Sequence, residues 1–569
     1  MRVLFRPLAA VAICFALAVP AAAQSVAGAY LAARAAAMDS DFEQAAAYYT
    51  RALARDPRNT QLMASAVVAR MALGEVDRAL PIAQALQSAG ESNQVAELVI
   101  KVDMIRKGAF STMTAPVEEG RGIGPLVDGL LRAWSFMGQG EVSNALAAFE
   151  EVRNQPGLEG FALYHEANAL ASVGDFEGAE AIYGSDNARA ALQTRRGVMA
   201  RVEVLSQLGR FDEALELLQT MFAGATDPEI DVVIEKLRSG TVLPFSHVTS
   251  VQDGFAEVFY TVADALRGEA GAEFTILYAQ AARILRPDHV DALLATAQLF
   301  ESLGQFGPAI EVYREVPSDH PAYHAAELGR AAALRRSDRP DASIEVLEQL
   351  ARSHGTLATV QSALGDAYRQ QDRFAEAVGA YDAAVELARD TGASSWFLLY
   401  ARAISNERLG NWELAESDFR AALDINPGQP QVLNYLGYSL VEKQIKLDEA
   451  LEMIEQAVAA SPDSGYIIDS LGWALYRLRR FEEAVPHMER AVELMPVDPV
   501  VNDHLGDVYW AVGRYREAEF QWARALSFVD LENVSDDADP DRIRRKLEVG
   551  LDQVLEEEGA EPLKVANDG

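Results

Sequence analysis

The stretch that decides the fold runs from Tyr466 to Pro496 and reads YIIDSLGWALYRLRRFEEAVPHMERAVELMP. Its apolar residues recur at intervals of three and four, which predicts two amphipathic helices. Gly472 and Ala484 are small where these helices are expected to cross, and Ala491 is small where the second helix meets the following one. Pro496 ends the second helix, because proline lacks an amide hydrogen and clashes with the preceding turn. The stretch therefore predicts a helical hairpin.

The same pattern returns along the chain with a period of about 34 residues. Its mark is a small residue near the start of each second helix, found at Ala45, Ala79, Ala145, Ala179, Ala214, Ala309, Ala342, Ala377, Ala415, Ala450, Ala484 and Ala518. This period is typical of tetratricopeptide repeats (TPRs). We therefore expect an all-α fold, a superhelical solenoid of TPR helix-turn-helix units.

Two interruptions divide the predicted solenoid into blocks. Glycines and prolines crowd residues 107–126, where one repeat is degraded or interrupted by a loop. Residues 224–271 are predicted to be an irregular helical connector, because the marks on either side of it are not separated by a whole number of repeats. We expect an N-terminal TPR block at 24–223 and a C-terminal TPR block at 272–530, with the superhelix changing direction between them.

The chain after residue 530 is predicted to cover the last repeat. Residues 531–569 begin with an acidic loop, continue as one amphipathic helix from Asp539 to Glu557, and end in a frayed tail. One face of that helix carries Ile543, Leu547, Leu551 and Val554. A terminal repeat leaves an apolar side open, so this helix is interpreted as a cap.

Residues 1–23 have the order of a cleavable signal peptide. Arg2 and Arg6 precede the apolar run Leu8–Val19, and three alanines at 21–23 follow it. The run is too short to cross a bilayer, which takes about 20 residues of helix. We expect an exported chain that starts near Gln24.

Cysteine usage and charge narrow the function classes further. Cys14 is the only cysteine and follows Ile13 rather than a small residue, so a lipid anchor is not expected. Removal of the signal leaves no cysteine, which excludes disulfides and thiolate metal sites. The net charge of -35, from 85 acidic and 50 basic residues, repels nucleic acid and anionic lipid. Partners are expected to be basic or apolar.

Chemical motifs are weak in this sequence. His320 and His324 stand four apart, as zinc ligands on a helix would, but no carboxylate or cysteine lies at a matching position and Pro321 places His320 at or before the helix start. Neither a G-x-S-x-G elbow, an H-E-x-x-H helix nor a P-loop occurs. We expect no metal, no cofactor and no enzymatic activity.

Gly120-x-Gly122-x-Gly124 resembles part of a phosphate-binding loop. No hydrophobic strand precedes it and the glycine at the sixth position is missing, so a loop between repeats is the better interpretation.

The inner surface of a TPR superhelix is lined by the first helix of each repeat. In the last four repeats the predicted lining positions combine aromatic with acidic side chains: Tyr400, Glu407, Asn434, Tyr438, Asp469, Trp473, Tyr476, Asp503, Asp507 and Trp510. Aromatic side chains are enriched among residues that carry binding energy, so we predict a peptide-binding groove. The alternative is that the rings only pack between repeats.

The acidic positions indicate which peptides the groove prefers. Asp469 and Asp503 stand where some proteins of this class hold a partner's C-terminal carboxylate with lysine and asparagine. A carboxylate would be repelled here, so extended segments with apolar or basic side chains fit better.

The region from Ala272 to Val529 resembles an exported TPR family found widely in proteobacteria. The likeness lies in ARILRPDH from Ala282, WELAESDFRAALDINPGQPQVLNYLGY from Trp412, NYLGYSL from Asn434, DSLGWALYRL from Asp469, NDHLGDVYW from Asn502 and EAEFQWARAL from Glu517. One member of that family is an outer-membrane lipoprotein that binds a periplasmic carboxyl-terminal processing protease and delivers substrates to it. The present sequence lacks the lipidated cysteine of that member, which puts membrane tethering in doubt.

The resemblance implies a non-enzymatic protein–protein interaction scaffold in the bacterial periplasm, peripheral association with the outer membrane being left open. Its expected role is that of an adaptor for a protease or an envelope-assembly enzyme, with that protease and its substrates as partners. A periplasmic holdase or carrier for unfolded polypeptides is the alternative. An enzyme without a recognisable motif is the third hypothesis.

Overall fold

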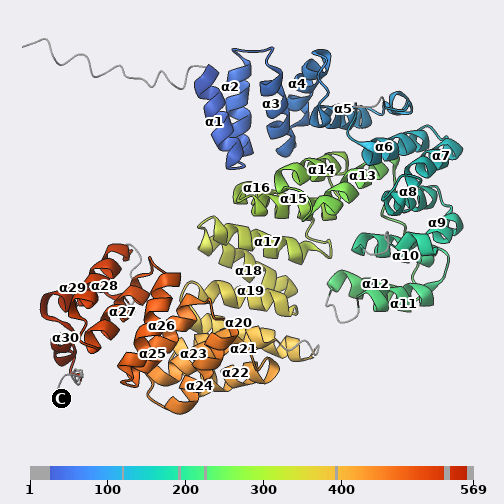
Figure 1. The fold of residues 1–569 in the computed structure, drawn as a ribbon. Helices are drawn as coiled ribbons and strands as arrows, with labels where there is room; N and C mark the ends of the chain where they lie inside the picture. Colours follow the sequence, from blue (N-terminus) through green and yellow to red (C-terminus); the bar gives the residue numbers. More distant parts are fainter. Residues whose placement is uncertain are drawn as a thin grey trace, which may run out of the picture. The chain divides into compact units, whose positions relative to one another are not determined.

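The computed structural model describes residues 26–117, 121–189, 194–222, 227–390, 395–530 and 538–560. The regular structure in these ranges is helical (Figure 1). The chain divides into two compact units, unit 1 (Met1–Leu347) and unit 2 (Glu348–Gly569). The predicted signal peptide with Cys14, the acidic loop at 531–537 and the tail from residue 561 lie outside the described residues. The predicted block boundaries rest on repeat spacing and stay a prediction.

Unit 1 begins with short antiparallel helices and contains two 3₁₀ turns. Its elements are α1 (Val26–Met38), α2 (Phe42–Leu53), α3 (Thr60–Ala72), α4 (Val76–Ser88), α5 (Gln94–Arg106), η2 (Phe110–Met113), α6 (Pro125–Gly138), α7 (Val142–Arg153), α8 (Glu159–Ser172), α9 (Phe176–Tyr183), η3 (Asp186–Arg189), α10 (Arg195–Gln207), α11 (Phe211–Met221), α12 (Pro228–Arg238), α13 (Val251–Leu266), α14 (Ala272–Leu285), α15 (Val290–Ser302), α16 (Phe306–Tyr313) and α17 (Tyr323–Arg336). The division between the units falls inside α18 (Pro340–His354).

Unit 2 continues with helical hairpins. Its helices are α19 (Ala358–Arg369), α20 (Phe374–Asp390), α21 (Trp396–Arg408), α22 (Trp412–Ile425), α23 (Pro430–Glu442), α24 (Leu447–Ala460), α25 (Gly465–Arg477), α26 (Phe481–Leu494), α27 (Pro499–Ala511), α28 (Tyr515–Phe528), α29 (Pro540–Val549) and α30 (Leu551–Glu557). The stretch quoted first forms the hairpin α25–α26, so the all-α repeat architecture predicted from it is confirmed. No helix in the described ranges is both long and apolar enough to span a membrane.

The small residue that marks each repeat is the fourth residue of its helix and is fully buried at every predicted position except Ala342. In α18 the prediction is wrong by one residue, because Ser343 holds the buried position, 34 residues after Ala309 and 34 before Ala377. The hydroxyl of Ser343 donates a hydrogen bond to the carbonyl of Ala331 at 2.8 Å. A serine can therefore take the place of the alanine when its hydroxyl has a partner.

One further repeat was not predicted, because it has no alanine at the marked position. Thr275 is the fourth residue of α14, is 1% exposed, and lies 34 residues before Ala309. Its hydroxyl donates to the carbonyl of Gly271 in the preceding turn, which satisfies the buried oxygen. The hairpin α13–α14 is thus spaced as a repeat, with threonine in the small position.

Glycines on several first helices let the two helices of a hairpin pack closely. A Cβ added to Gly472 on α25 would overlap the sulfur of Met488 on α26. A Cβ on Gly437 would lie 2.7 Å from Cγ1 of Ile454, which is closer than carbon atoms approach each other. The expected crossing of the two helices at Gly472 is therefore confirmed.

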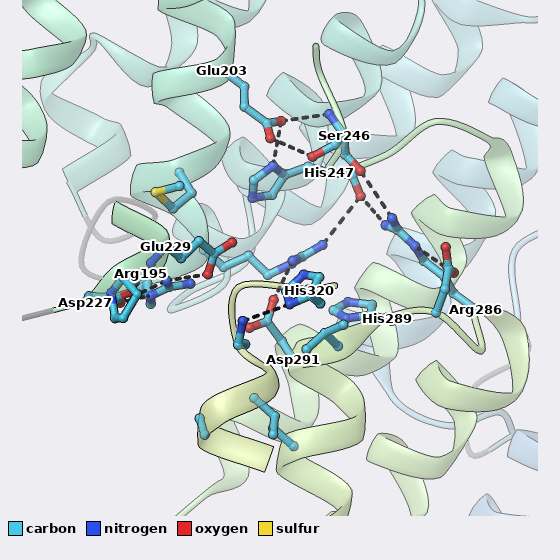
Figure 2. A pocket seen from close by; sticks show the side chains of 18 of the residues that line it. Arg195, Glu203, Asp227, Glu229, Ser246, His247, Arg286, His289, Asp291 and His320 are labelled. Atoms are coloured by element: carbon cyan, nitrogen blue, oxygen red, sulfur yellow. Dashed lines mark hydrogen bonds and ion pairs between the residues drawn. The ribbon is translucent and has the colours of Figure 1, made fainter. Parts of the chain in front are cut away.

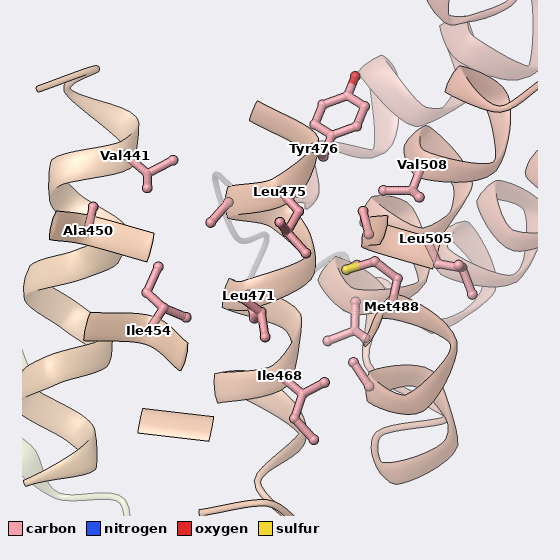
Figure 3. Packing of buried hydrophobic residues seen from close by; sticks show 14 of the residues in the cluster. Val441, Ala450, Ile454, Ile468, Leu471, Leu475, Tyr476, Met488, Leu505 and Val508 are labelled. Atoms are coloured by element: carbon pink, nitrogen blue, oxygen red, sulfur yellow. The ribbon is translucent and has the colours of Figure 1, made fainter. Parts of the chain in front are cut away.

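A continuous apolar core runs through unit 2 from α21 to α30. Figure 3 shows Ile468, Leu471 and Leu475 of α25 directed toward Met488 and Leu505. These side chains are at most 4% exposed. Because each helix contacts both its hairpin partner and the next hairpin, stacking gives a core that no single repeat could form.

Unit 1 is folded back on itself. Helix α13 packs against α6 and α8, and α14 packs against α3 and α5, as Figure 1 also shows for α13 and α6. Gly254 of α13 lies against the ring of Trp134 on α6, and the Gln280 amide donates to the Ala72 carbonyl at 2.8 Å in a buried contact. The hairpin α13–α14 therefore covers faces of the earlier helices that an open solenoid would leave accessible.

A buried polar network holds this arrangement. Trp134 Nε1 donates to His165 Nδ1 at 3.3 Å, and His165 Nε2 donates to the Thr261 hydroxyl at 3.1 Å. The guanidinium of Arg196 on α10 donates through Nε to Glu257 Oε1 on α13 at 2.6 Å. Glu257 is fully buried, and Arg196 lowers the pKa of its carboxyl well below the usual value although burial acts in the opposite direction.

Candidate functional site

The predicted lining residues lie on the first helices of four successive hairpins in unit 2. Those helices are α21, α23, α25 and α27. Five of the ten residues are half-buried, namely Tyr400, Glu407, Tyr438, Trp473 and Trp510. The other five are buried, namely Asn434, Asp469, Tyr476, Asp503 and Asp507.

The aromatic residues of α25 form a stack rather than separate anchors. The Trp473 ring lies parallel to Tyr476 with centroids 4.8 Å apart, and its other neighbour is the His504 ring at 3.9 Å. Trp473 Nε1 donates to the exposed carboxylate of Glu442 on α23 at 3.0 Å. Trp473 is thus half-buried and fixed in orientation by three neighbours.

Tyr400 is placed differently. Its ring packs against Phe419 and Tyr435, with centroids 6.0 and 6.1 Å away, and burial raises the pKa of its hydroxyl to about 12. The alternative interpretation, packing between repeats, therefore accounts for much of this ring. Tyr435, which is not among the predicted residues, donates to Glu407 at 3.5 Å and belongs to the same patch.

Asp469 is paired inside the protein. His504 Nδ1 lies 3.0 Å from Asp469 Oδ2, and both side chains are buried. Burial alone would lower the pKa of His504, but the Asp469 carboxylate, with help from Asp503 and Asp507, raises it above its ordinary value. The His504 imidazole, whose charged form Asp469 favours, therefore faces the carboxylate that we expected to repel a partner's carboxylate.

Asp503 and Asp507 meet a lysine from the C-terminal helix. Lys546 Nζ of α29 lies 2.8 Å from Asp503 Oδ2 and 2.6 Å from Asp507 Oδ1, and its side chain is fully buried. Trp522 Nε1 of α28 also donates to Asp507 Oδ1 at 2.8 Å. From the sequence, both carboxylates were predicted to lie on an open surface. In the structure α29 covers them.

Trp510 is covered at its polar end by α30. Its Nε1 donates to Asp552 Oδ2 at 3.1 Å, and its ring touches Gly550 so closely that a Cβ there would overlap it. The single helix predicted from Asp539 to Glu557 is wrong in this respect. Gly550 has a φ of 84°, which breaks the segment into α29 and α30 and lets both helices reach α27.

A polar cavity of about 510 Å³ opens in unit 1 (Figure 2). It is lined by arginine, histidine and carboxylate side chains, among them Arg195, Arg196, Glu203, Asp227, Glu229, His247, Arg286, His289, Asp291, His320 and His324. Each guanidinium has partners in the protein. Arg195 pairs with Asp227 and Glu229, Arg196 with Glu257 and Asp291, and Arg286 with the carbonyls of Ser246 and His247.

The two histidines considered as zinc ligands line this cavity but do not share a helix face. Helix α17 begins at Tyr323, so His320 precedes it, as Pro321 predicted. His320 Nδ1 accepts from the Ala322 amide at 3.1 Å, and His324 Nδ1 lies 2.8 Å from the Pro321 carbonyl. In the described part of the chain, no cluster of three or more histidine, cysteine or acidic residues is placed to hold a metal ion.

The glycine-rich loop also binds its own carboxylate. The amides of Ile123 and Gly124 donate to Asp128 Oδ2 at 3.0 and 2.8 Å. Gly122 and Gly124 have positive φ, and Gly120 lies outside the described residues. The interpretation as a loop between repeats is consistent with these contacts, because Asp128 takes the amides that a phosphate would need.

Comparison with protein families supports the repeat assignment. A family model described as tetratricopeptide repeat matches residues 30–93, 328–394, 400–465, 436–499 and 470–528. A second model with the same description matches residues 291–323. The chain is therefore a tetratricopeptide-repeat-containing protein.

A curated relative carries the same description. The TPR repeat-containing protein PA4667 of Pseudomonas aeruginosa is 36% identical over 80 residues, which is 14% of this chain and 14% of that protein. The match thus spans a small part of the relative's length.

Solved structures with a similar arrangement of helices include the APC/C hetero-tetramer Cut9–Hcn1. That likeness has a TM-score of 0.39 at 14% identity and covers 93% of this chain and 97% of the other. A tetratricopeptide repeat protein from Parabacteroides merdae gives a TM-score of 0.38 at 15% identity, covering 45% and 97%.

Proposed function

We propose that this protein is an exported scaffold that binds a protein partner on the inner surface of α21, α23 and α25. TPR proteins generally mediate protein–protein interaction, and the family resemblance of the region 272–529 favours an adaptor for a periplasmic carboxyl-terminal processing protease. The observation that carries the proposal is the half-exposed ring of Trp473. The ring is held in place by Tyr476, His504 and Glu442, so little side-chain entropy is lost on binding.

The same surface favours a partner with apolar and basic side chains. Glu442 is exposed beside Trp473, and Glu407 is half-buried on the neighbouring helix. Tyr438, on the same helix as Glu442, is half-buried. Half-exposed aromatic rings beside carboxylates suit a lysine or arginine whose alkyl chain packs on the ring.

Capture from a periplasmic extract under mild crosslinking, followed by calorimetry with the purified processing protease, tests the proposal. We expect saturable binding that weakens at least about tenfold when Tyr438→Ala and Trp473→Ala are combined. Phe520→Ala is the matched control, because Phe520 is an aromatic residue on α28 that is 64% exposed and is not among the lining residues. Failure to recover any protein partner would contradict the scaffold role.

A further inference from the structure

The C-terminal hairpin α29–α30 occupies the inner surface of α27 in the way a bound partner helix would. Ile543, Leu551 and Val554 are at most 3% exposed, and Ile543 and Leu551 belong to the core of unit 2. On the same side of α29, Lys546 reaches Asp503 and Asp507. The hairpin thus supplies both an apolar stripe and a cation.

A cap does not need this lysine. The open side of a terminal repeat requires only apolar cover, and taking an ammonium and two carboxylates out of water is costly. An apolar side chain at position 546, with uncharged residues at 503 and 507, would cover the repeat as well. The charged contact is therefore better explained by recognition of a cation than by stability.

The hairpin α29–α30 does not pair every carboxylate oxygen of this site. The Lys546 ammonium is shared between two carboxylates, and Asp503 Oδ1 is buried without a hydrogen-bond partner. Arg542, one helical turn before Lys546, lies 3.8 Å from Asp507 Oδ2 but forms its shorter bond, of 2.8 Å, with Glu558 of its own hairpin. A basic residue in the place of Arg542 that had no acidic partner of its own would pair with these carboxylates more completely.

We propose that α29–α30 is a displaceable self-ligand, and that the surface it covers binds a partner's amphipathic helix carrying two basic residues four positions apart. The inference deepens the proposed function, since it names the chemistry of the partner and extends the accessible surface from α25 to α27. Binding of that helix requires the hairpin to leave Asp503 and Asp507.

A peptide of residues 538–558, labelled with a fluorophore, tests this directly. In the full chain, Ile543→Asp with Leu551→Asp should release the hairpin while leaving α27 unchanged. We expect the peptide to bind this variant at least tenfold more tightly than it binds the wild-type chain. Equal binding to both chains, or no binding to the variant, would overturn the proposal.

Substitutions in the peptide separate specific recognition from general apolar adhesion. Lys546→Glu should weaken binding to the released variant at least tenfold. Arg544→Glu is the matched control and should bind like the original, because Arg544 is 49% exposed and its ion pair is with Asp541 of the same helix. Equal loss from the two peptides would show that the carboxylates of α27 do not select the cation.

Hydrogen exchange of the wild-type chain tests the same proposal if the variant does not fold. The amides of α29 and α30 should exchange at least tenfold faster than those of α25 and α27, by an opening that leaves the repeats folded. Exchange of both sets at one rate would mean that the hairpin leaves only on global unfolding, and the inference would be wrong. Partner binding that depends on Trp473 but not on the hairpin would reject this inference and keep the proposed scaffold.

Discussion

At the scale of single residues, buried polar side chains in both units are matched to one protonation state. The Lys546 ammonium lies between the carboxylates of Asp503 and Asp507. His165 is neutral because one ring nitrogen accepts from Trp134 and the other donates to Thr261. Removing the charge of Lys546, or adding a proton to His165, leaves a buried polar group without its partner. The free-energy cost of that unpaired group is larger than the stabilisation that the pair contributes.

Removal of the Lys546 charge should therefore destabilise unit 2. We expect Lys546→Met to lower the free energy of unfolding by about 3 kcal/mol, because two buried carboxylates lose their counter-ion. Adding Asp503→Asn and Asp507→Asn to it should restore most of the loss. Urea unfolding of the three proteins checks this, and a triple variant less stable than the single one would contradict it.

Lowering the pH should reduce the stability of unit 1 through protonation of His165. Burial lowers the pKa of its imidazole to about 4 from 6.5, so the unfolded state takes up a proton first as the pH falls. The stabilisation is fully present above pH 6.5 and is lost toward pH 4, by about 3 kcal/mol for a shift of this size. Protection factors of α6 and α8 amides at pH 6.5 and 4.5, corrected for the intrinsic exchange rate at each pH, measure the loss, and His165→Gln should reduce the difference.

At the scale of elements, several first helices carry a glycine that admits a large residue from the second helix. Gly506 of α27 lies against the Trp522 ring of α28, which is fully buried. Gly379 lies in α20, a second helix, and has open space where its Cβ would be. The two glycines are thus opposite cases, one packed against a ring and one open.

Gly506→Ala should lower the stability of unit 2 by about 1–3 kcal/mol, since the added methyl group would overlap the ring. Gly379→Ala is expected to raise it by up to about 1 kcal/mol, because alanine favours an exposed helix interior. Thermal unfolding of the two variants compares them. Equal shifts in Tm would contradict the assigned packing at Gly506.

Sequence alone could predict the hairpins, because each alanine mark reports a contact between neighbouring helices. The alanine pattern put one mark at Ala342 instead of Ser343 and missed Thr275. Serine and threonine fit the same small buried position when their hydroxyl groups donate a hydrogen bond within the helix turn or the hairpin. The covering of Asp503 by Lys546 could not be predicted, because 43 residues separate them and helical periodicity does not report docking at that distance.

At the scale of the whole molecule, the proposed signal peptide at residues 1–23 predicts a mature chain shorter than the encoded one. We expect fractionation of a Gram-negative bacterium that expresses the gene to recover the protein in the periplasm, with an N-terminus near Gln24 on Edman sequencing. Replacing the apolar run Leu8–Val19 with polar residues should retain the full-length chain in the cytoplasm. Recovery of an uncleaved chain starting at Met1 in the periplasm would contradict cleavage.

The packing of α14 against α3 and α5 also determines how unit 1 can fold. In most solenoids each repeat contacts only its neighbours, so structure can grow from any point along the chain. Here the bond from Gln280 to Ala72 joins residues 208 positions apart. Helices α3 and α5 can therefore complete their packing only after the chain as far as α14 has folded against them. Folding should be slow and cooperative across unit 1.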